Sequence, residues 1–315
     1  MSVPELSALV AGRRTLAVIG LAKNCGKTTV VNHLLERLEG PVGLASLGLD
    51  GERTDHLTGL PKPRVKPPRG ALVATADDLP AAGRVCLRTG IGTAVGEVVV
   101  VQADGSRAIV VSGPARLGEL DQLVEQLRRL GARTVLLEGA LGRLGPAAPG
   151  RAEGVVVAAG AAAARDASEL EQTLVLGLDA LAPPVSDEPA AIAIEHAAGY
   201  ERELVDRIAA AAPGPVEVAG AVTGQLLEQL LRAGVRARLI APDATHLLAS
   251  PRQLARAWRA GVTTAVRAPL AVLAVTSSPF HPDHAIGADR AFAAAVRAAA
   301  GRWPVHDVVS GRMAA

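Results

Sequence analysis

Short runs of apolar residues alternate along this chain with longer stretches in which apolar residues recur every three or four positions. The run TLAVIG (15–20) is followed by TTVVNHLLERLEG (28–40) and then by VGLASL (42–47). Short continuous apolar runs are typical of strands buried on both faces, and the longer periodic stretches are typical of amphipathic helices. Residues 15–47 therefore predict a strand–helix–strand unit with parallel strands.

The same alternation continues toward the C-terminus and indicates the fold class. Further strands are predicted at 134–138, 154–160, 237–242 and 271–277, and an amphipathic helix at 120–131. Buried strands separated by helices suit a parallel sheet covered by helices on both faces. We therefore predict an α/β fold built on a doubly wound, mainly parallel sheet.

The length of 315 residues allows one large domain or two ordinary ones. The proline-rich segment APPVSDEP (182–189) is the best candidate boundary. We expect a first domain over residues 1–185 and a C-terminal α/β half over residues 186–315. That second half either continues the first sheet or forms its own.

Two segments interrupt the alternation of strands and helices. Residues 97–113 contain two apolar runs around a turn at Asp104-Gly105, which predicts an inserted antiparallel hairpin. An aspartate after an apolar strand also matches a metal ligand, but Gly105 and the second run favour the turn, so Asp104 is left out of the site. The basic, proline-rich segment 61–70 is either a solvated connector or a basic strip against phosphates or a partner.

The clearest chemical signal is the segment AVIGLAKNCGKTTV (17–30). It places a strand, a turn with Gly20 and Gly26, and then Lys27-Thr28-Thr29 at the start of a helix, which is the arrangement of a P-loop. Glycine lets backbone N–H groups face phosphates, Lys27 is suited to the β- and γ-phosphates, and Thr28 to Mg²⁺. We therefore predict a site for ATP and Mg²⁺ here.

The rest of the loop joins this predicted nucleotide site. Lys23, Asn24 and Cys25 lie between the two glycines, which are separated by five residues where the usual motif has four. The chain has only four lysines among its 33 basic residues, and Lys23 and Lys27 are two of them. The run Gly-Lys-Thr-Thr in a chain so poor in lysine favours a phosphate ligand over a plain glycine turn.

A P-loop also needs an acidic residue near the metal, usually at the end of a neighbouring apolar strand. The strand TVLLE ends in Glu138, which we assign to Mg²⁺ and to catalysis. Asp50 follows the second predicted strand and is the candidate that orients the attacking water through the metal shell. A plain turn at Asp50-Gly51 explains the same residues without catalysis, and a helix cap is the alternative for Glu138.

Composition narrows the classes of function. Aromatic residues make up 2% of the chain and the formal net charge is +2. The chain therefore lacks both the aromatic side chains that stack on bases and the excess of basic residues that neutralises phosphates, so we do not expect it to bind nucleic acid. The apolar run at 155–164 is too short to span a membrane. Two cysteines do not make a disulfide framework, which favours a cytoplasmic protein.

The loop resembles those of a known class of nucleotide-binding proteins. Its five-residue spacing is similar to that of dethiobiotin synthetase, and Lys-Asn-Cys-Gly-Lys-Thr-Thr resembles the MobB group; both belong to the SIMIBI class of P-loop NTPases. This resemblance implies that Ser278 and Pro279, after a sheet strand, contact the nucleotide base. It also implies two alternatives for Lys23, an exposed loop residue or a lysine that reaches a partner's nucleotide in a homodimer.

Blocks of sequence between residues 15 and 309 also resemble the KamB-type reactivase subunit, among them SLGLDGERTD, TGIGTAVGE, EGALGRLGPA, APDATHLL and AVTSSPFHP. Proteins of that family accompany adenosylcobalamin-dependent lysine or ornithine aminomutases together with a MutS-like ATPase. The resemblance implies ATP and Mg²⁺ on this subunit, cobalamin on the client, and restoration of enzyme with a damaged cofactor. The chain has Glu138 and Ser278 where the family is expected to have Asp and Asn.

Two other functions remain open from the sequence. A ligase of the dethiobiotin synthetase type would phosphorylate a carboxylate and would need a pocket for a small organic acid. A scaffold that binds nucleotide without hydrolysing it would need Lys27 for stability alone. The hypothesis that accounts for most of the chain is partner-coupled ATP hydrolysis, with a conformational switch as its output.

Overall fold

The computed structural model describes residues 5–22, 24–50, 64–139, 144–161, 166–195, 202–278 and 290–309. The chain divides into two compact units, of which unit 1 comprises residues 1–171 and 271–315 and unit 2 comprises residues 172–270. This division differs from the expected boundary near residue 186. The strands after residue 271 continue the sheet of unit 1, which was one of the two alternatives, whereas residues 186–270 belong to unit 2.

Unit 1 is built on a nine-stranded sheet with the order β17-β16-β9-β1-β8-β2-β4-β6-β5. Its strands are β1 (Thr15–Gly20), β2 (Val42–Ser46), β4 (Leu72–Ala76), β5 (Gly83–Thr93), β6 (Gly96–Ala103), β8 (Thr134–Glu138), β9 (Gly154–Gly160), β16 (Val272–Ser278) and β17 (Val305–Asp307). The pairings from β17 to β4 are all parallel, and those of β6 with β4 and β5 are antiparallel. The predicted mainly parallel α/β sheet is confirmed.

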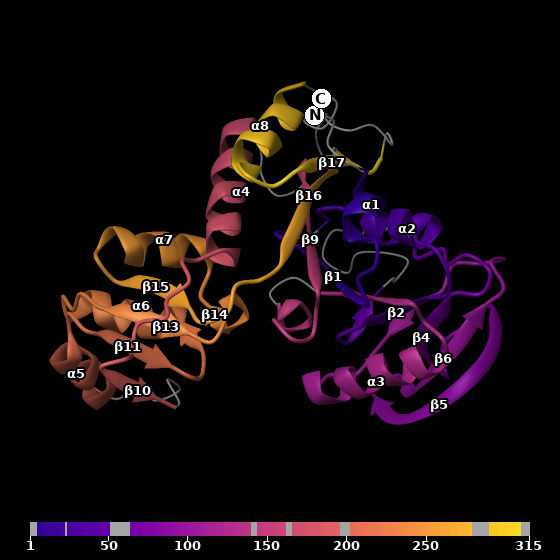
Figure 1. The fold of residues 1–315 in the computed structure, drawn as a ribbon, viewed down its shortest axis with the longest axis horizontal. Helices are drawn as coiled ribbons and strands as arrows, with labels where there is room; N and C mark the ends of the chain where they lie inside the picture. Colours follow the sequence, from indigo (N-terminus) through magenta and orange to yellow (C-terminus); the bar gives the residue numbers. More distant parts are fainter. Residues whose placement is uncertain are drawn as a thin grey trace. The chain divides into compact units, whose positions relative to one another are not determined.

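Helices cover both faces of this sheet (Figure 1). The remaining elements of unit 1 are α1 (Leu6–Val10), α2 (Lys27–Arg37), α3 (Leu117–Arg129), α8 (Arg290–Ala300), the 3-10 turn η1 (Gly145–Ala147) and the short strands β3 (Leu49–Asp50) and β7 (Val111–Ser112). Leu34 of α2 shares a buried cluster with Leu16 and Val18 of β1. On the other face, Leu127 of α3 lies beside Val135 of β8. Alternate residues of a strand point to opposite faces of the sheet. A strand that is apolar throughout therefore places apolar side chains under the helices on both faces.

The predicted hairpin at residues 97–113 is wrong. Strand β6 pairs with β5, which precedes it, whereas β7 pairs with β3 in a separate two-stranded ladder. An antiparallel hairpin does extend the sheet, but it spans residues 83–103 and turns at residues 94–95. The segment TGIGTAVG, which contains five threonine or glycine positions, forms strand and turn. Thr89 and Thr93 donate hydrogen bonds to Val98 O and Gly96 O across the hairpin.

Unit 2 has its own parallel sheet with the order β10-β11-β13-β15 and its own buried cluster. Its elements are β10 (Ile192–Ile194), α5 (Arg202–Ala211), β11 (Pro215–Val218), β12 (Val222–Thr223), α6 (Gly224–Arg232), β13 (Arg238–Ala241), η3 (Ala244–His246), β14 (Leu247–Leu248), α7 (Pro251–Arg259) and β15 (Thr263–Val266). Helix α4 (Ala167–Leu181) crosses the division between the units. No helix in the described ranges is long and apolar enough to cross a membrane.

Candidate functional site

The predicted phosphate loop lies where the strand order of unit 1 reverses. Strand β1 pairs with β8 on one side and with β9 on the other. From β1 the chain first builds the β2–β4 side of the sheet, and from β8 it then moves to the β9–β16 side. In open α/β sheets, ligands bind at the carboxyl ends of the strands at such a reversal. The loop at residues 21–26 therefore occupies the expected ligand position.

Two residues give this loop its shape. Asn24 has φ 55° and Gly26 has φ 92°, so both adopt the left-handed conformation. Gly26 caps α2, and the first helical hydrogen bond runs from Val30 N–H to Gly26 O at 3.0 Å. The amides of residues 27–29 thus precede the helical ladder, as in an anion-binding helix start.

Close packing beneath the loop requires glycine at residues 20 and 160. The side chain of Cys25 is 1% exposed, and its Sγ lies where a methyl group on Gly20 would stand. The backbone of Cys25 likewise fills the space that a methyl group on Gly160 would need. Cys25 therefore acts as a small residue that fills the loop. The role of Gly160 is not visible in the sequence, because only the fold brings β9 under the loop.

Lys27 and Ser278 also lie against the loop glycines. A methyl group on Gly20 would lie 3.0 Å from Lys27 Cγ, which places the stem of Lys27 back across the end of β1. A methyl group on Gly26 would lie 2.6 Å from Ser278 Cβ. The end of β16 therefore touches the glycine that caps α2, and base contact by Ser278 remains a prediction.

The phosphate loop is joined to the predicted acid by a direct hydrogen bond. Thr28 Oγ1 donates to Glu138 Oε1 at 3.2 Å, and Glu138 is fully buried at the end of β8. Strand pairing sets this approach, because Val18 of β1 is in register with Glu138. A hydroxyl and a carboxylate that converge beside a helix start are ligand types that Mg²⁺ accepts. The predicted pair Thr28 and Glu138 is thus brought together.

For the other residues of the predicted site, the structure describes only part of their surroundings. The backbone of Asp50 lies in β3, in register with Val111 of β7, and its side chain lies outside the described part of the chain. Lys23 and Pro279 also lie outside the described residues. Thr29 follows Thr28 in the first turn of α2 and is half-buried. No group of three or more His, Cys, Asp or Glu residues suited to a metal occurs in the described ranges.

The sequence analysis did not identify Asn32 of α2, which lies one helical turn beyond Thr28. Its amide Nδ2 donates to Arg64 O and its Oδ1 accepts from Lys66 N–H, both at 2.9 Å. Between these two residues, Val65 is fully buried and its carbonyl accepts from Ile109 N–H at 3.0 Å. Residues 64–66 of the basic segment are therefore fastened to the helix that follows the predicted phosphate loop. Only the tertiary structure reveals this contact, because its partners are 32 or more residues apart.

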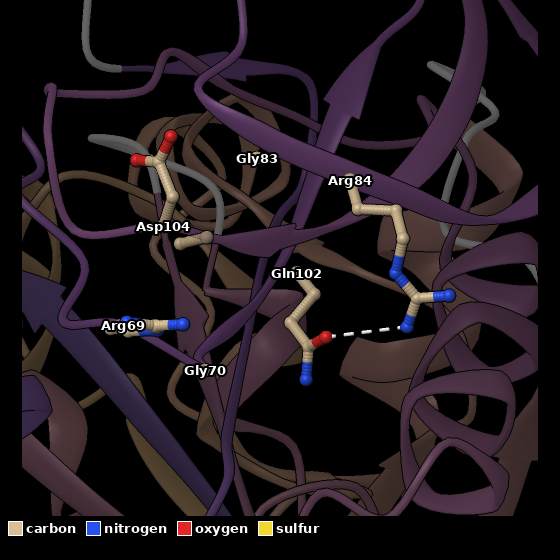
Figure 2. Close-up of a pocket in the computed structure, with 7 residues that line it drawn as sticks. Arg69, Gly70, Gly83, Arg84, Gln102 and Asp104 are labelled. Atoms are coloured by element: carbon tan, nitrogen blue, oxygen red, sulfur yellow. Dashed lines mark hydrogen bonds between the residues drawn. The ribbon is translucent and has the colours of Figure 1, made fainter.

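A shallow hollow of about 400 Å³ lies elsewhere on unit 1 (Figure 2). It is lined by Arg69, Gly70, Gly83, Arg84, Gln102, Ala103 and Asp104. Gln102 is in register with Leu72, the first residue of β4. The hollow therefore lies at the amino edge of the parallel strands, whereas the phosphate loop follows the carboxyl end of β1. Asp104 lies in a turn away from the loop, in agreement with its exclusion from the site.

Comparisons of the chain with protein-family models, with curated proteins and with solved structures found no match.

Proposed function

We propose that this chain is a P-loop NTPase that binds ATP and Mg²⁺ at residues 20–29 and hydrolyses the γ-phosphate. The observation that carries the proposal is the hydrogen bond of 3.2 Å from Thr28 Oγ1 to the buried Glu138 Oε1. A glycine turn that merely starts a helix has no need of a fully buried carboxylate directed at the second helical residue. The reversed strand order and the left-handed residues at 24 and 26 add independent support.

The residues of the loop have distinct roles in this proposal. The amides at the start of α2 bind the phosphate oxygens, and the Lys27 ammonium neutralises charge that develops between the β- and γ-phosphates. Thr28 and Glu138 hold the metal and its water shell. Bound Mg²⁺ supplies further neutralisation of the phosphate charge. Asp50, the last residue of β3 and paired with Val111 of β7, orients the attacking water.

The biological role that we propose rests on the sequence resemblance. The chain would act as a cytoplasmic, chaperone-like accessory subunit that reactivates a cobalamin-dependent amino-acid aminomutase together with a MutS-like ATPase. Hydrolysis at the phosphate loop would switch its conformation, and the client would hold the cobalamin. A homodimer in which Lys23 reaches the partner's nucleotide is part of this proposal.

The first test is ATP binding and phosphate release by the purified chain with Mg²⁺. Lys27→Ala should lower hydrolysis by roughly 100-fold or more, because a cation aligned with the transferred phosphate is lost. Arg129→Ala is the control, since Arg129 is an exposed cation on α3 and its loss should leave hydrolysis unchanged. Equal rates for Lys27→Ala and the unaltered chain, at saturating ATP, would refute hydrolysis at this loop.

A second test measures the contribution of Glu138 to Mg²⁺ binding separately from the role of Lys27 in hydrolysis. Glu138→Gln keeps the shape of the side chain and removes its charge, so the Mg²⁺ concentration for half-maximal hydrolysis should rise roughly tenfold. Thr28→Ser keeps the hydroxyl and should retain most activity. If Glu138→Gln changes neither the Mg²⁺ dependence nor the rate, the proposed metal site is wrong.

The accessory role has its own measurement. Hydrolysis is compared for the chain alone, with an aminomutase whose cofactor is damaged, and with a MutS-like ATPase added. Stimulation by the client that Lys27→Ala abolishes supports reactivation. Stimulation by a small carboxylic acid instead supports the ligase of the dethiobiotin synthetase type, and client function that survives Lys27→Ala supports the scaffold.

A further inference from the structure

The hollow at the amino edge of the sheet draws its side chains from three separate segments. Arg69 and Gly70 come from the turn before β4, Arg84 comes from β5, and Gln102 and Asp104 come from the end of β6 and the turn after it. Figure 2 shows these side chains around one opening, with Gln102 between Asp104 and Arg84. The basic segment 61–70 thus ends at this edge, and its last arginine lines the hollow.

The backbone around the hollow is firmly held. Arg69 follows two prolines, and Gly70 N–H donates to Ala103 O at 2.8 Å. Gly83 has φ 141°, and any side chain there would collide with the backbone of Gln102. Proline fixes φ and glycine permits this close approach, so the two arginines project from rigid segments. A ligand would therefore have to order only the side chains.

The two arginines have no carboxylate partner within the described ranges. Elsewhere in unit 1, Arg88 pairs with Asp77 at 2.9 Å and Arg151 pairs with Asp121 at 2.6 Å. The Arg84 guanidinium instead donates to Gln102 Oε1 at 3.3 Å, which leaves the Gln102 Nε2 donor for another acceptor. An arginine fork beside an amide donor is suited to a planar anion.

Asp104 does not neutralise these arginines by contact. Its Oδ1 accepts from Ser106 N–H at 2.8 Å and from Ser106 Oγ at 2.7 Å. The hydrogen bonds from Ser106 hold the pKa of Asp104 below its usual value, so its carboxyl stays ionised at neutral pH. Oδ1 of Asp104 is therefore held by its own turn and not by the two arginines.

Three backbone amides at or beside the hollow are already used. Gly70 N–H bonds to Ala103 O, Asp104 N–H to Ala82 O at 3.4 Å, and Ser106 N–H to its own turn. Phosphate sites in proteins commonly recruit backbone amides or a helix start, as the loop at residues 21–26 does. The side-chain donors at the hollow are guanidinium groups and an amide, whose planar forks match a carboxylate.

We propose that this hollow binds a carboxylate group through Arg69, Arg84 and Gln102, at a site separate from the phosphate loop. The carboxylate belongs either to a free organic acid or to an acidic peptide segment, since both present the same planar anion. The proposal does not depend on ATP hydrolysis. Lys27→Ala therefore leaves carboxylate binding unchanged.

The test is a titration of the ¹⁵N-labelled full chain followed by NMR at constant ionic strength, with glutarate, a hexaglutamate peptide and inorganic phosphate as probes. We expect saturable shifts at Gly70, Gly83 and Gln102 with a carboxylate probe. Arg69→Gln/Arg84→Gln should weaken binding at least tenfold, and Arg129→Gln should not, because Arg129 is an exposed arginine outside the hollow.

The double variant Arg69→Lys/Arg84→Lys tests whether binding needs the shape of the guanidinium groups as well as their charge. It keeps both positive charges but removes the planar guanidinium groups, so binding should still weaken several-fold. Far-UV circular dichroism and the urea midpoint check that each variant folds. Tighter binding of hexaglutamate than of glutarate identifies a peptide as the source, and equal binding identifies a small acid. Absence of saturable shifts, phosphate binding as tight as that of both carboxylates, or unchanged binding by the Gln variant would overturn the proposal.

Discussion

Glycine 160 ends β9 directly beneath the phosphate loop, where the backbone of Cys25 leaves no space for a side chain. Gly160→Ala should therefore displace the loop, because overpacking a close-packed interior typically costs about 1–3 kcal/mol. We expect a lower urea midpoint together with loss of ATP binding. Both are measured on the same samples, by denaturation and by titration calorimetry.

Gly118→Ala is the matched control for this substitution. Gly118 lies in the first turn of α3, and a methyl group there would meet no atom within 4 Å. Alanine favours helix over glycine by up to about 1 kcal/mol, so stability should be equal or slightly higher. If Gly160→Ala resembles Gly118→Ala in both measurements, the close approach at Cys25 does not constrain the loop.

The buried imidazole of His306 on β17 makes the stability of unit 1 depend on pH. His306 is 4% exposed, its Nε2 has no hydrogen-bond partner in the described part of the chain, and burial lowers its pKa, against a smaller opposing effect of Glu5. Below a pH of about 6.5, the unfolded chain gains a proton that the folded imidazole does not accept. The free energy of unfolding therefore falls as the pH decreases through that value, until the folded-state pKa is reached.

Urea midpoints between about pH 8 and pH 5 measure this effect. His306→Leu fills a similar volume without a titratable group, so its midpoint should fall less over the same range. Identical pH dependence of the two proteins would show that His306 does not contribute. A comparison at pH 8, where His306 is neutral in both states, isolates the packing change.

At the scale of elements, the side chain of Asn32 joins helix α2 to residues 64–66 of the basic segment through two hydrogen bonds of 2.9 Å. Asn32→Ala leaves the Arg64 carbonyl and the Lys66 amide without these partners, which should cost about 1–3 kcal/mol of stability. Hydrogen exchange at the Lys66 amide should become faster by a corresponding factor.

Asn32→Asp provides the comparison, because it keeps the acceptor for Lys66 N–H and loses the donor to Arg64 O. The Lys66 amide should then remain protected while stability falls by a smaller amount. Fast exchange of Lys66 in the unaltered protein would contradict the contact itself.

Some strands were predicted correctly from the hydrophobic pattern of the sequence, and others were not. Strands β1 and β9 have the predicted bounds because each is a single apolar run with turn residues at its ends. The hairpin was assigned to residues 97–113, although β6 pairs with β5. Periodicity identifies a strand but carries no information about its partner, and the glycines of β5 interrupt the apolar pattern that would mark it as a strand.

At the scale of the whole molecule, each unit has its own sheet and contains one tryptophan. Trp258 in unit 2 donates from Nε1 to Thr264 Oγ1 at 3.0 Å, and Trp303 lies in unit 1. ATP with Mg²⁺ at 100 times its Kd should stabilise the unit that binds it by about 2.7 kcal/mol. We expect the fluorescence transition of Trp303 to move to higher urea while that of Trp258 stays in place.

Single-tryptophan proteins, made by Trp258→Phe and by Trp303→Phe, separate the two signals. Lys27→Ala serves as the control, since its Trp303 transition should not respond to ATP. Transitions that shift together would show that the two units unfold as one cooperative body.

The sequence by itself determined the α/β class, most strands of the parallel sheet and the candidate phosphate loop. These features are local, because burial on both faces, helical periodicity and a glycine-rich turn before a helix each lie within a short stretch of chain. The residues that the loop would use, among them Lys27 and Thr28, were therefore identifiable without a structure.

Only the tertiary structure decided which distant residues meet. It joined Thr28 to Glu138, brought Gly160 under Cys25, fastened residues 64–66 to Asn32, and returned β16 and β17 to the first sheet. Such contacts depend on strand order and on the close packing of segments far apart in the chain, which hydrophobic patterns do not encode. The arginine-lined hollow at the amino edge has the same origin, since its three segments meet only in the folded sheet.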